Sequence, residues 1–156
     1  MMKRLALVFL LIGTASTAEA RRNVGGIGIG VIIGEPTAGT LEFWLDGPTS
    51  LDFAIGIASF DDHNLYIHLD FKVYPVDLAR GGPIGVPLYL GVGAWLYNPG
   101  DDLILGPRVP FGLALHFRHA PLQIFFEVAI KFWLVKPSTI DRVADVDVNA
   151  GFRIFF

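Results

Sequence analysis

The chain has 156 residues, which suits one domain, and its formal net charge of -3 gives no basic surface for nucleic acid. It contains no cysteine, so neither a disulfide framework nor a lipid-anchored lipoprotein is expected. Hydrophobic residues make up 53% of the chain. Yet beyond residue 20 no apolar run approaches the roughly 18 to 20 residues that a membrane helix requires.

The first twenty residues predict a secretory signal peptide. A basic start is followed by the apolar run Leu5–Ile12, which is too short to span a bilayer as a helix. A small-residue cleavage site ends at Ala20. We therefore expect residues 1–20 to be removed after Ala20 and residues 21–156 to form an exported domain.

The rest of the chain alternates between apolar and polar residues with a period of two, which is typical of β-strands. Residues 65–74 show this most clearly, because every second residue is apolar while the others include His68, Asp70 and Lys72. The predicted strands, in chain order, are 26–33, 40–45, 51–58, 65–74, 88–96, 108–118, 123–134 and 146–156. Short connections join them, the longer ones being Pro75–Gly85, Tyr97–Pro107 and Lys136–Asp145. This pattern predicts an all-β fold, an eight-stranded antiparallel up-and-down β-barrel.

Alternation alone does not say which face is outside, so a soluble, lipocalin-like barrel with an apolar interior is the alternative. The apolar face carries no charged residue in any segment, as a lipid-facing surface requires. The other face combines glycine and alanine with five acids and five bases, a balance that suits a buried surface because an unpaired buried charge is costly. We therefore expect a transmembrane barrel with an interior charge network of Glu42, Asp52, His68, Asp70, Lys72, Arg108, His116, Arg118, Glu127, Lys131, Asp147 and Arg153.

Two aromatic features accompany this pattern. Phe152, Ile154 and Phe156 share one face of the last segment. This ending resembles the C-terminal signal by which the bacterial barrel-assembly machinery recognises its substrates. Three tryptophans, Trp44, Trp95 and Trp133, fall on the inward phase near strand ends, where they either plug the lumen or turn outward at a bulge.

Four stretches carry a family resemblance: Gly30–Thr37, Val86–Val92, Arg108–Gly112 and Asp145–Phe156. Together they resemble a group of small, largely uncharacterised outer-membrane β-barrel proteins with an OmpA/OmpX-like architecture. The likeness covers almost the whole predicted domain. It implies the fold and the location in the bacterial outer membrane, and it implies no catalytic residues.

No catalytic, cofactor or metal site is expected. His68 and Asp70 lie two apart on one strand face and suit either a proton relay or the interior salt-bridge lattice, which we favour. His116 would join His68 in a metal site only if the strands bring them level. A lipid-modifying enzyme would need an inward serine, but Ser59 falls on the outward phase and Ser50 falls in a connection.

Function is therefore expected at the connections. With the amino terminus in the periplasm, acidic clusters at Asp61-Asp62 and Asp101-Asp102 face the cell exterior, beside lipopolysaccharide. The favoured hypothesis is a closed anchoring barrel that presents short loops for interaction with an extracellular or periplasmic protein. A narrow pore is the second hypothesis, because inward glycines leave interior volume. A lipid-modifying enzyme is the third.

Overall fold

The computed structural model describes residues 26–58, 64–79, 81–138 and 141–156. The predicted signal peptide, Ser59 and the cluster Asp61-Asp62 lie outside these residues. In the part of the chain that the structure describes, no helix is long and apolar enough to cross a membrane.

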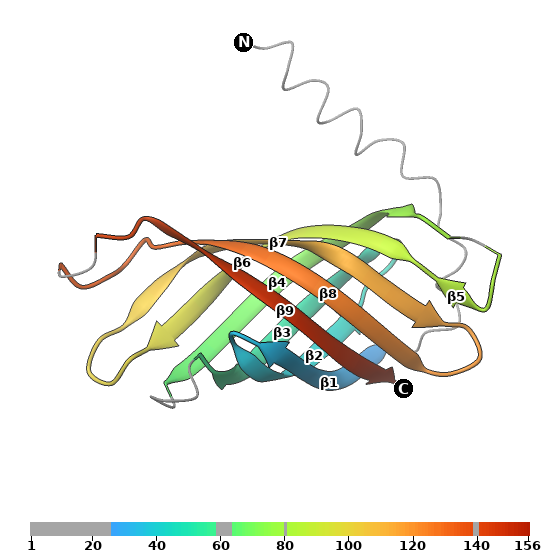
Figure 1. The fold of residues 1–156 in the computed structure, drawn as a ribbon, viewed down its shortest axis with the longest axis horizontal. Helices are drawn as coiled ribbons and strands as arrows, with labels where there is room; N and C mark the ends of the chain where they lie inside the picture. The colour runs from blue at the N-terminus through green and yellow to red at the C-terminus, as the bar shows by residue number, and fades with distance from the viewer. Residues whose placement is uncertain (1–25, 59–63, 80, 139–140) are drawn as a thin grey trace, which may run out of the picture.

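The described residues form one antiparallel sheet that closes on itself (Figure 1). Neighbouring strands pair in chain order, and β1 pairs with β9 to complete the ring. Its strands are β1 (Ile27–Gly34), β2 (Thr37–Trp44), β3 (Thr49–Ile57), β4 (Leu65–Asp77), β5 (Ile84–Gly85), β6 (Pro87–Asn98), β7 (Ile104–Phe117), β8 (Leu122–Phe132) and β9 (Ala144–Phe155). Eight of them form the barrel, while β5 is a two-residue segment that pairs with the end of β7.

The predicted all-β, eight-stranded antiparallel barrel is confirmed, but two predicted connections are wrong in length. The stretch Pro75–Gly85 is not one loop, because β4 continues to Asp77 and β5 pairs within it. Pro75 is accommodated where the register between β4 and β6 shifts, an irregularity of the kind that tolerates proline. The predicted loop Tyr97–Pro107 is also too long, since Pro107 lies within β7 opposite Ala94.

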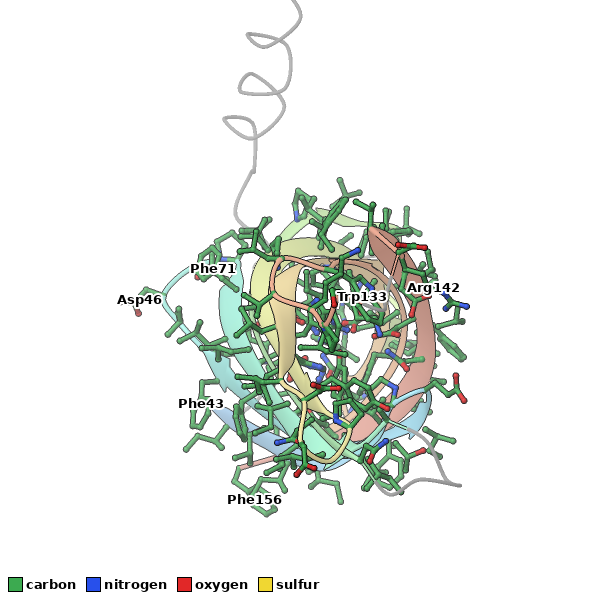
Figure 2. The ribbon with its side chains drawn as sticks, turned by 90° about the vertical axis from the view of Figure 1, so that its left-hand side faces the viewer. Phe43, Asp46, Phe71, Trp133, Arg142 and Phe156 are labelled. Carbon is green, nitrogen blue, oxygen red and sulfur yellow. The ribbon has the colours of Figure 1, made fainter. Side chains whose placement is uncertain are left out.

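The two faces of the strands separate apolar from charged side chains. Exposed apolar side chains on the outer surface include Ile29, Leu69, Leu90, Val92 and Val148. Figure 2, which looks toward one end of the barrel, shows Phe43, Phe71 and Phe156 on the outside and Trp133 over the middle of the ring. The inner face is polar, with charged residues from six of the strands buried in the lumen. The barrel therefore has its apolar face outside and its polar face inside, which is the reverse of a soluble barrel.

Aromatic rings of neighbouring strands cover several inward glycines. A Cβ added to Gly112 would lie 2.8 Å from the ring of Tyr89, and one added to Gly151 would lie 2.4 Å from the ring of Phe125. A ring that packs against a glycine fills the space that the missing side chain leaves, and designed β-barrels use the same pairing of a ring with a glycine. At Gly112 and Gly151, neighbouring rings therefore occupy the space that the missing side chains leave.

Candidate functional site: a charged lumen and a cup at one mouth

Seven buried charges form a continuous chain across the lumen, in which acids and bases alternate. In order along the chain they are Asp70, Arg108, Glu127, Lys72, Asp52, Arg153 and Glu42. Each of these side chains is at most 1% exposed. The chain connects six strands, from β4 and β7 to β2 and β9.

Glu127 and Asp52 each bridge two cations. Glu127 lies 2.7 Å from Lys72 Nζ through Oε2 and 2.5 Å from Arg108 Nη2 through Oε1. Asp52 contacts Lys72 Nζ and lies 2.6 Å from Arg153 Nη2. Because each internal charge has an opposite charge on both sides, the cost of removing these groups from water is offset within the lumen.

The register of the strands explains why the chain crosses the lumen instead of following the wall. Glu42 lies opposite Asp52, and Asp52 lies opposite Asp70, so three acids stand side by side on β2, β3 and β4. Like charges directly opposite one another repel. The bases that neutralise this row reach it mainly from other strands, with Arg108 on β7 and Arg153 on β9.

Both ends of the charge chain are acids. At one end, Glu42 accepts hydrogen bonds from the hydroxyls of Ser50, at 2.8 Å, and Tyr74. At the other end, His68 Nε2 lies 3.7 Å from Asp70 Oδ2. Within the described residues, neither ring nitrogen of His68 has a hydrogen-bond partner, and neither does Asp70 Oδ1. This end is polar, buried and incompletely paired by protein groups.

The position of Ser50 corrects the expectation that it lies in a connection. Ser50 is the second residue of β3, and its side chain is fully buried inside the barrel. The strand begins at Thr49, two residues earlier than the turn-like composition of Asp46–Ser50 indicates. Its hydroxyl donates to a carboxylate that also holds Tyr74, an arrangement that secures Glu42.

A second, smaller charge cluster lies near the mouth of the barrel. Lys131 Nζ lies 2.6 Å from Asp147 Oδ1 and 3.8 Å from Asp145 Oδ2. It also lies over the rings of Trp95 and Tyr66, 4.8 and 5.6 Å from their centroids. The hydroxyl of Tyr66 donates to Asp147 at 3.2 Å. This lysine is therefore held by carboxylates and ring faces together.

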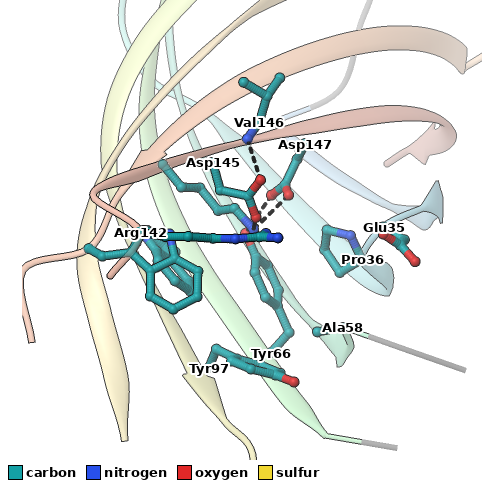
Figure 3. A pocket seen from close by; sticks show the side chains of 12 residues that line it. Glu35, Pro36, Ala58, Tyr66, Tyr97, Arg142, Asp145, Val146 and Asp147 are labelled. Atoms are coloured by element: carbon teal, nitrogen blue, oxygen red, sulfur yellow. Dashed lines mark hydrogen bonds and ion pairs between the residues drawn. The ribbon is translucent and has the colours of Figure 1, made fainter. Parts of the chain in front are cut away.

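Above Lys131 the barrel opens into a cup of about 290 Å³. Figure 3 shows the cup with the side chain of Arg142 extending across it toward Asp145 and the ring of Tyr97 on the opposite side. Aromatic, acidic and basic side chains all contribute to its wall. The lining residues are Glu35, Pro36, Ala58, Tyr66, Trp95, Tyr97, Lys131, Trp133, Arg142, Asp145, Val146 and Asp147.

Aromatic side chains also gather at the opposite end of the lumen. The ring centroids of Trp44 and Tyr74 are 4.6 Å apart, and those of Tyr74 and Tyr89 are 5.4 Å apart. Nearby, His116 Nε2 lies 2.8 Å from Gln123 Nε2, and its ring meets Trp44 edge-on. The three inward tryptophans thus pack within the lumen near its ends, Trp95 and Trp133 at the cup and Trp44 at the other end.

Two residues of the expected network, His116 and Arg118, belong neither to the charge chain nor to the Lys131 cluster. His116 lies with Gln123 and Trp44, away from His68, whose ring contacts Tyr66. Arg118 lies just past the end of β7, where it is partly exposed and its backbone N–H donates to Pro83 O. Of the five acids and five bases that were expected inside, the two clusters together hold five acids and four bases, because Arg118 belongs to neither.

Sequence reasoning from charges alone misses the neutral groups that complete the lumen. Thr40 donates to Asp52 at 2.7 Å, and Tyr89 donates to Glu127 at 3.0 Å. Gln123 accepts from Arg153 at 2.9 Å. These three residues lie on the inward-facing positions of their strands, so the alternation of residues along each strand could have identified them. The cup residues Arg142 and Asp145 lie in a predicted connection, and no periodic signal marks them.

Comparison with known proteins supports the fold. No known family model and no curated protein sequence matches the chain. Its structure is similar to the crystal structure of the N-terminal β-barrel domain of OprF from Pseudomonas aeruginosa, with a TM-score of 0.56 and 12% sequence identity. The match covers 83% of this chain and 95% of that one. The expected resemblance to small eight-stranded barrels is thereby confirmed at the level of the fold.

Proposed function

We propose that the protein is an integral β-barrel of the bacterial outer membrane, anchored there as a closed barrel that presents one mouth and its short connections for interaction. The apolar outer surface supports a membrane location, because lipid-facing strands require an uncharged exterior. Closure of the sheet supports it as well, since only a closed barrel pairs its backbone groups in hydrocarbon. Export by the predicted signal peptide and insertion by the barrel-assembly machinery belong to the same proposal.

The single observation that carries the closed state is the charge chain from Asp70 to Glu42. It crosses the lumen through contacts between strands on different sides of the barrel, and its members are almost completely buried. In the proposed closed state, water and ions pass only if these ion pairs separate. Breaking a buried pair costs several kcal/mol, typically about 3 to 5, so a steady open channel is disfavoured.

A narrow pore is less well supported than a closed barrel. Its main support is the interior volume at inward glycines, but Tyr89 packs against Gly112 and Phe155 packs against Gly28. Gly91 and Gly93 lie against Lys72 and Asp70 in the same way. The space that glycine leaves is therefore used by rings and by the charge chain.

A lipid-modifying enzyme is also less well supported. Ser50 is an inward serine, but its hydroxyl donates to Glu42 in the packed lumen rather than to a histidine. A nucleophile for acyl transfer needs a base that removes its proton and an open path to substrate. The site of Ser50 is a buried structural hydrogen bond, and we place the function at the mouth instead.

Cell fractionation tests the location. Expressed with its own residues 1–20, the protein should be recovered with the outer membrane and should migrate faster on gels before heating than after it, as a folded barrel does. Recovery in the soluble periplasmic fraction, or the same mobility before and after heating, would contradict the membrane barrel.

Liposome swelling tests the closed state. Vesicles that contain the refolded barrel should swell in small sugars no faster than vesicles without protein. The same vesicles should show protein insertion by flotation, so that absence of swelling reflects a closed lumen. Rapid swelling that changes in the variant Glu127→Gln would favour the narrow pore.

A further inference from the structure

We propose that the cup above Lys131 binds an uncharged saccharide unit. The inference rests on the proposed function, because the cup meets such ligands only if this mouth faces the cell exterior. It follows from three properties of the lining: Lys131 already occupies the position of a cation, two aromatic side chains are only partly buried, and the rim holds both hydrogen-bond donors and acceptors.

The cation position of the cup is filled by the chain itself. Lys131 Nζ lies over the rings of Trp95 and Tyr66 and 2.6 Å from the carboxylate of Asp147. Ring faces and a carboxylate are what would attract a cationic ligand. Because Lys131 already takes these groups, the cup offers an organic cation no vacant aromatic cage, and Lys131 and Arg142 partly offset the three acids of the wall. The lining thus favours a neutral ligand.

Two aromatic side chains of the wall are only partly buried. Trp133 and Tyr97 line the cup at the ends of β8 and β6, and the ring of Trp133 meets Trp95 at an angle of 69° with centroids 5.6 Å apart. The face of an aromatic ring carries partial negative charge, so it attracts the polarised C–H groups on the flat side of a sugar ring. These rings supply the apolar part of a saccharide site.

The rim supplies hydrogen-bond donors and acceptors next to one another. The Asp145 side chain is 37% exposed and accepts hydrogen bonds, while the exposed Arg142 donates them. The Tyr97 hydroxyl accepts from Asn64 Nδ2 at 2.9 Å, which leaves its own proton to donate. Adjacent sugar hydroxyls donate and accept at once, so they match a rim of this composition.

The size of the cup limits the ligand. Its volume of about 290 Å³ is at the lower end of the range for small-molecule pockets, roughly 300 to 1,000 Å³. One or two sugar rings would fit such a space. A saccharide of this size has two sources at an outer surface: the sugar headgroup of lipopolysaccharide in the same membrane, and a free glycan from outside.

Titration of the refolded barrel in detergent micelles tests the inference. The probes are methyl glycosides of neutral hexoses and of N-acetylhexosamines, a delipidated core oligosaccharide from lipopolysaccharide, and tetramethylammonium. We expect saturable binding of at least one saccharide, measured by calorimetry and by tryptophan fluorescence. Trp133→Leu and Asp145→Asn should each weaken it by about tenfold or more, the loss of roughly 1.4 kcal/mol of binding free energy.

Matched controls separate loss of the site from loss of the fold. Leu134→Ala removes an exposed apolar neighbour of Trp133, and Asp101→Asn removes an exposed acid at the same end of the barrel but outside the cup. Both controls should bind like the wild type, and all variants should keep heat-modifiable gel mobility. Binding of the core oligosaccharide alone would identify the membrane's own lipid as the source, and binding of simple glycosides would identify an external glycan.

Two results would overturn the saccharide assignment: no saturable binding of any saccharide by the folded barrel, or tighter binding of tetramethylammonium than of every saccharide. Neither result bears on the closed lumen, because binding in micelles is measured independently of swelling and of cell location. Failure of the saccharide site and failure of the closed anchor are thus distinguishable.

Discussion

Gly93 shows how closely the charge chain fits the wall of the barrel. This residue of β6 lies opposite Asp70 on β4 and opposite Arg108 on β7. A Cβ placed on it would lie 2.1 Å from Asp70 Oδ1 and 2.2 Å from Leu69 O. A missing side chain between an acid and its base thus allows the Asp70–Arg108 ion pair to form across β6.

Gly93→Ala should therefore destabilise the barrel, by about 1 to 3 kcal/mol, because the added methyl group must displace a buried carboxylate or the backbone. The free energy of unfolding in urea, measured for the refolded protein in lipid vesicles, checks this. Gly39→Ala is the matched control, since the nearest atom to its added Cβ is 3.9 Å away. Equal stability of the two variants would contradict the tight fit at Gly93.

Glu127 is the residue on which the charge chain depends most, because it pairs with Lys72 and Arg108 and also accepts from Tyr89. Glu127→Gln keeps the shape but leaves two buried cations short of one negative charge, and we expect a loss of about 3 to 5 kcal/mol of stability. Glu35→Gln, at the exposed β1–β2 turn, should change the unfolding free energy little. A Glu127→Gln barrel as stable as the Glu35→Gln barrel would show that the charge chain contributes little to the free energy of unfolding.

At the scale of the strands, alternation predicts most of the architecture. It assigns the observed face to most strand residues that the structure describes, because one slip of register would turn every charge of a strand to the outer face. Strand ends are predicted less well, since prolines such as Pro75 and Pro107 are read as breaks although the barrel tolerates them. Ser50 is misplaced for the same reason, because a turn-like composition hides the start of β3.

The strands also show the limit of sequence reasoning about the site. The alternation of strand residues predicts that Asp70, Arg108 and Glu127 face inward. It does not predict which of them form ion pairs, because that depends on the relative shift of strands that are far apart in sequence. The cup could not be predicted, because Arg142 comes from an irregular connection, Asp145 lies at the start of β9 within a predicted loop, and both join Tyr66 and Trp95 only through closure of the barrel.

The outward-facing residues of β6 allow a test of the orientation of a strand. Leu90 is 48% exposed on the outer surface of β6, next to the exposed Val92. Leu90→Arg should lower the free energy of unfolding in lipid by about 2 to 4 kcal/mol, because it places a charge in hydrocarbon. Leu103→Arg, in the connection before β7, should cost about 1 kcal/mol or less, since it lies toward the membrane surface. Similar losses at both positions would contradict the assigned depth of Leu90.

The whole molecule combines an apolar exterior with a lumen that is filled along its length. The cup and its rings lie at one mouth, the seven-residue charge chain lies below them, and the cluster of Trp44, Tyr74 and Tyr89 lies toward the other end. The first and last strands of the barrel, β1 and β9, pair with each other. This arrangement is the basis of the proposal that the barrel is closed.

Conductance of the refolded barrel in a planar lipid bilayer tests the closed lumen most directly. The account predicts that verified insertion produces no steady channel current across a range of voltages and salt concentrations, because the charge chain from Asp70 to Glu42 closes the lumen. A stable, large conductance that shifts in Glu127→Gln would show that ions pass between these residues and would contradict it.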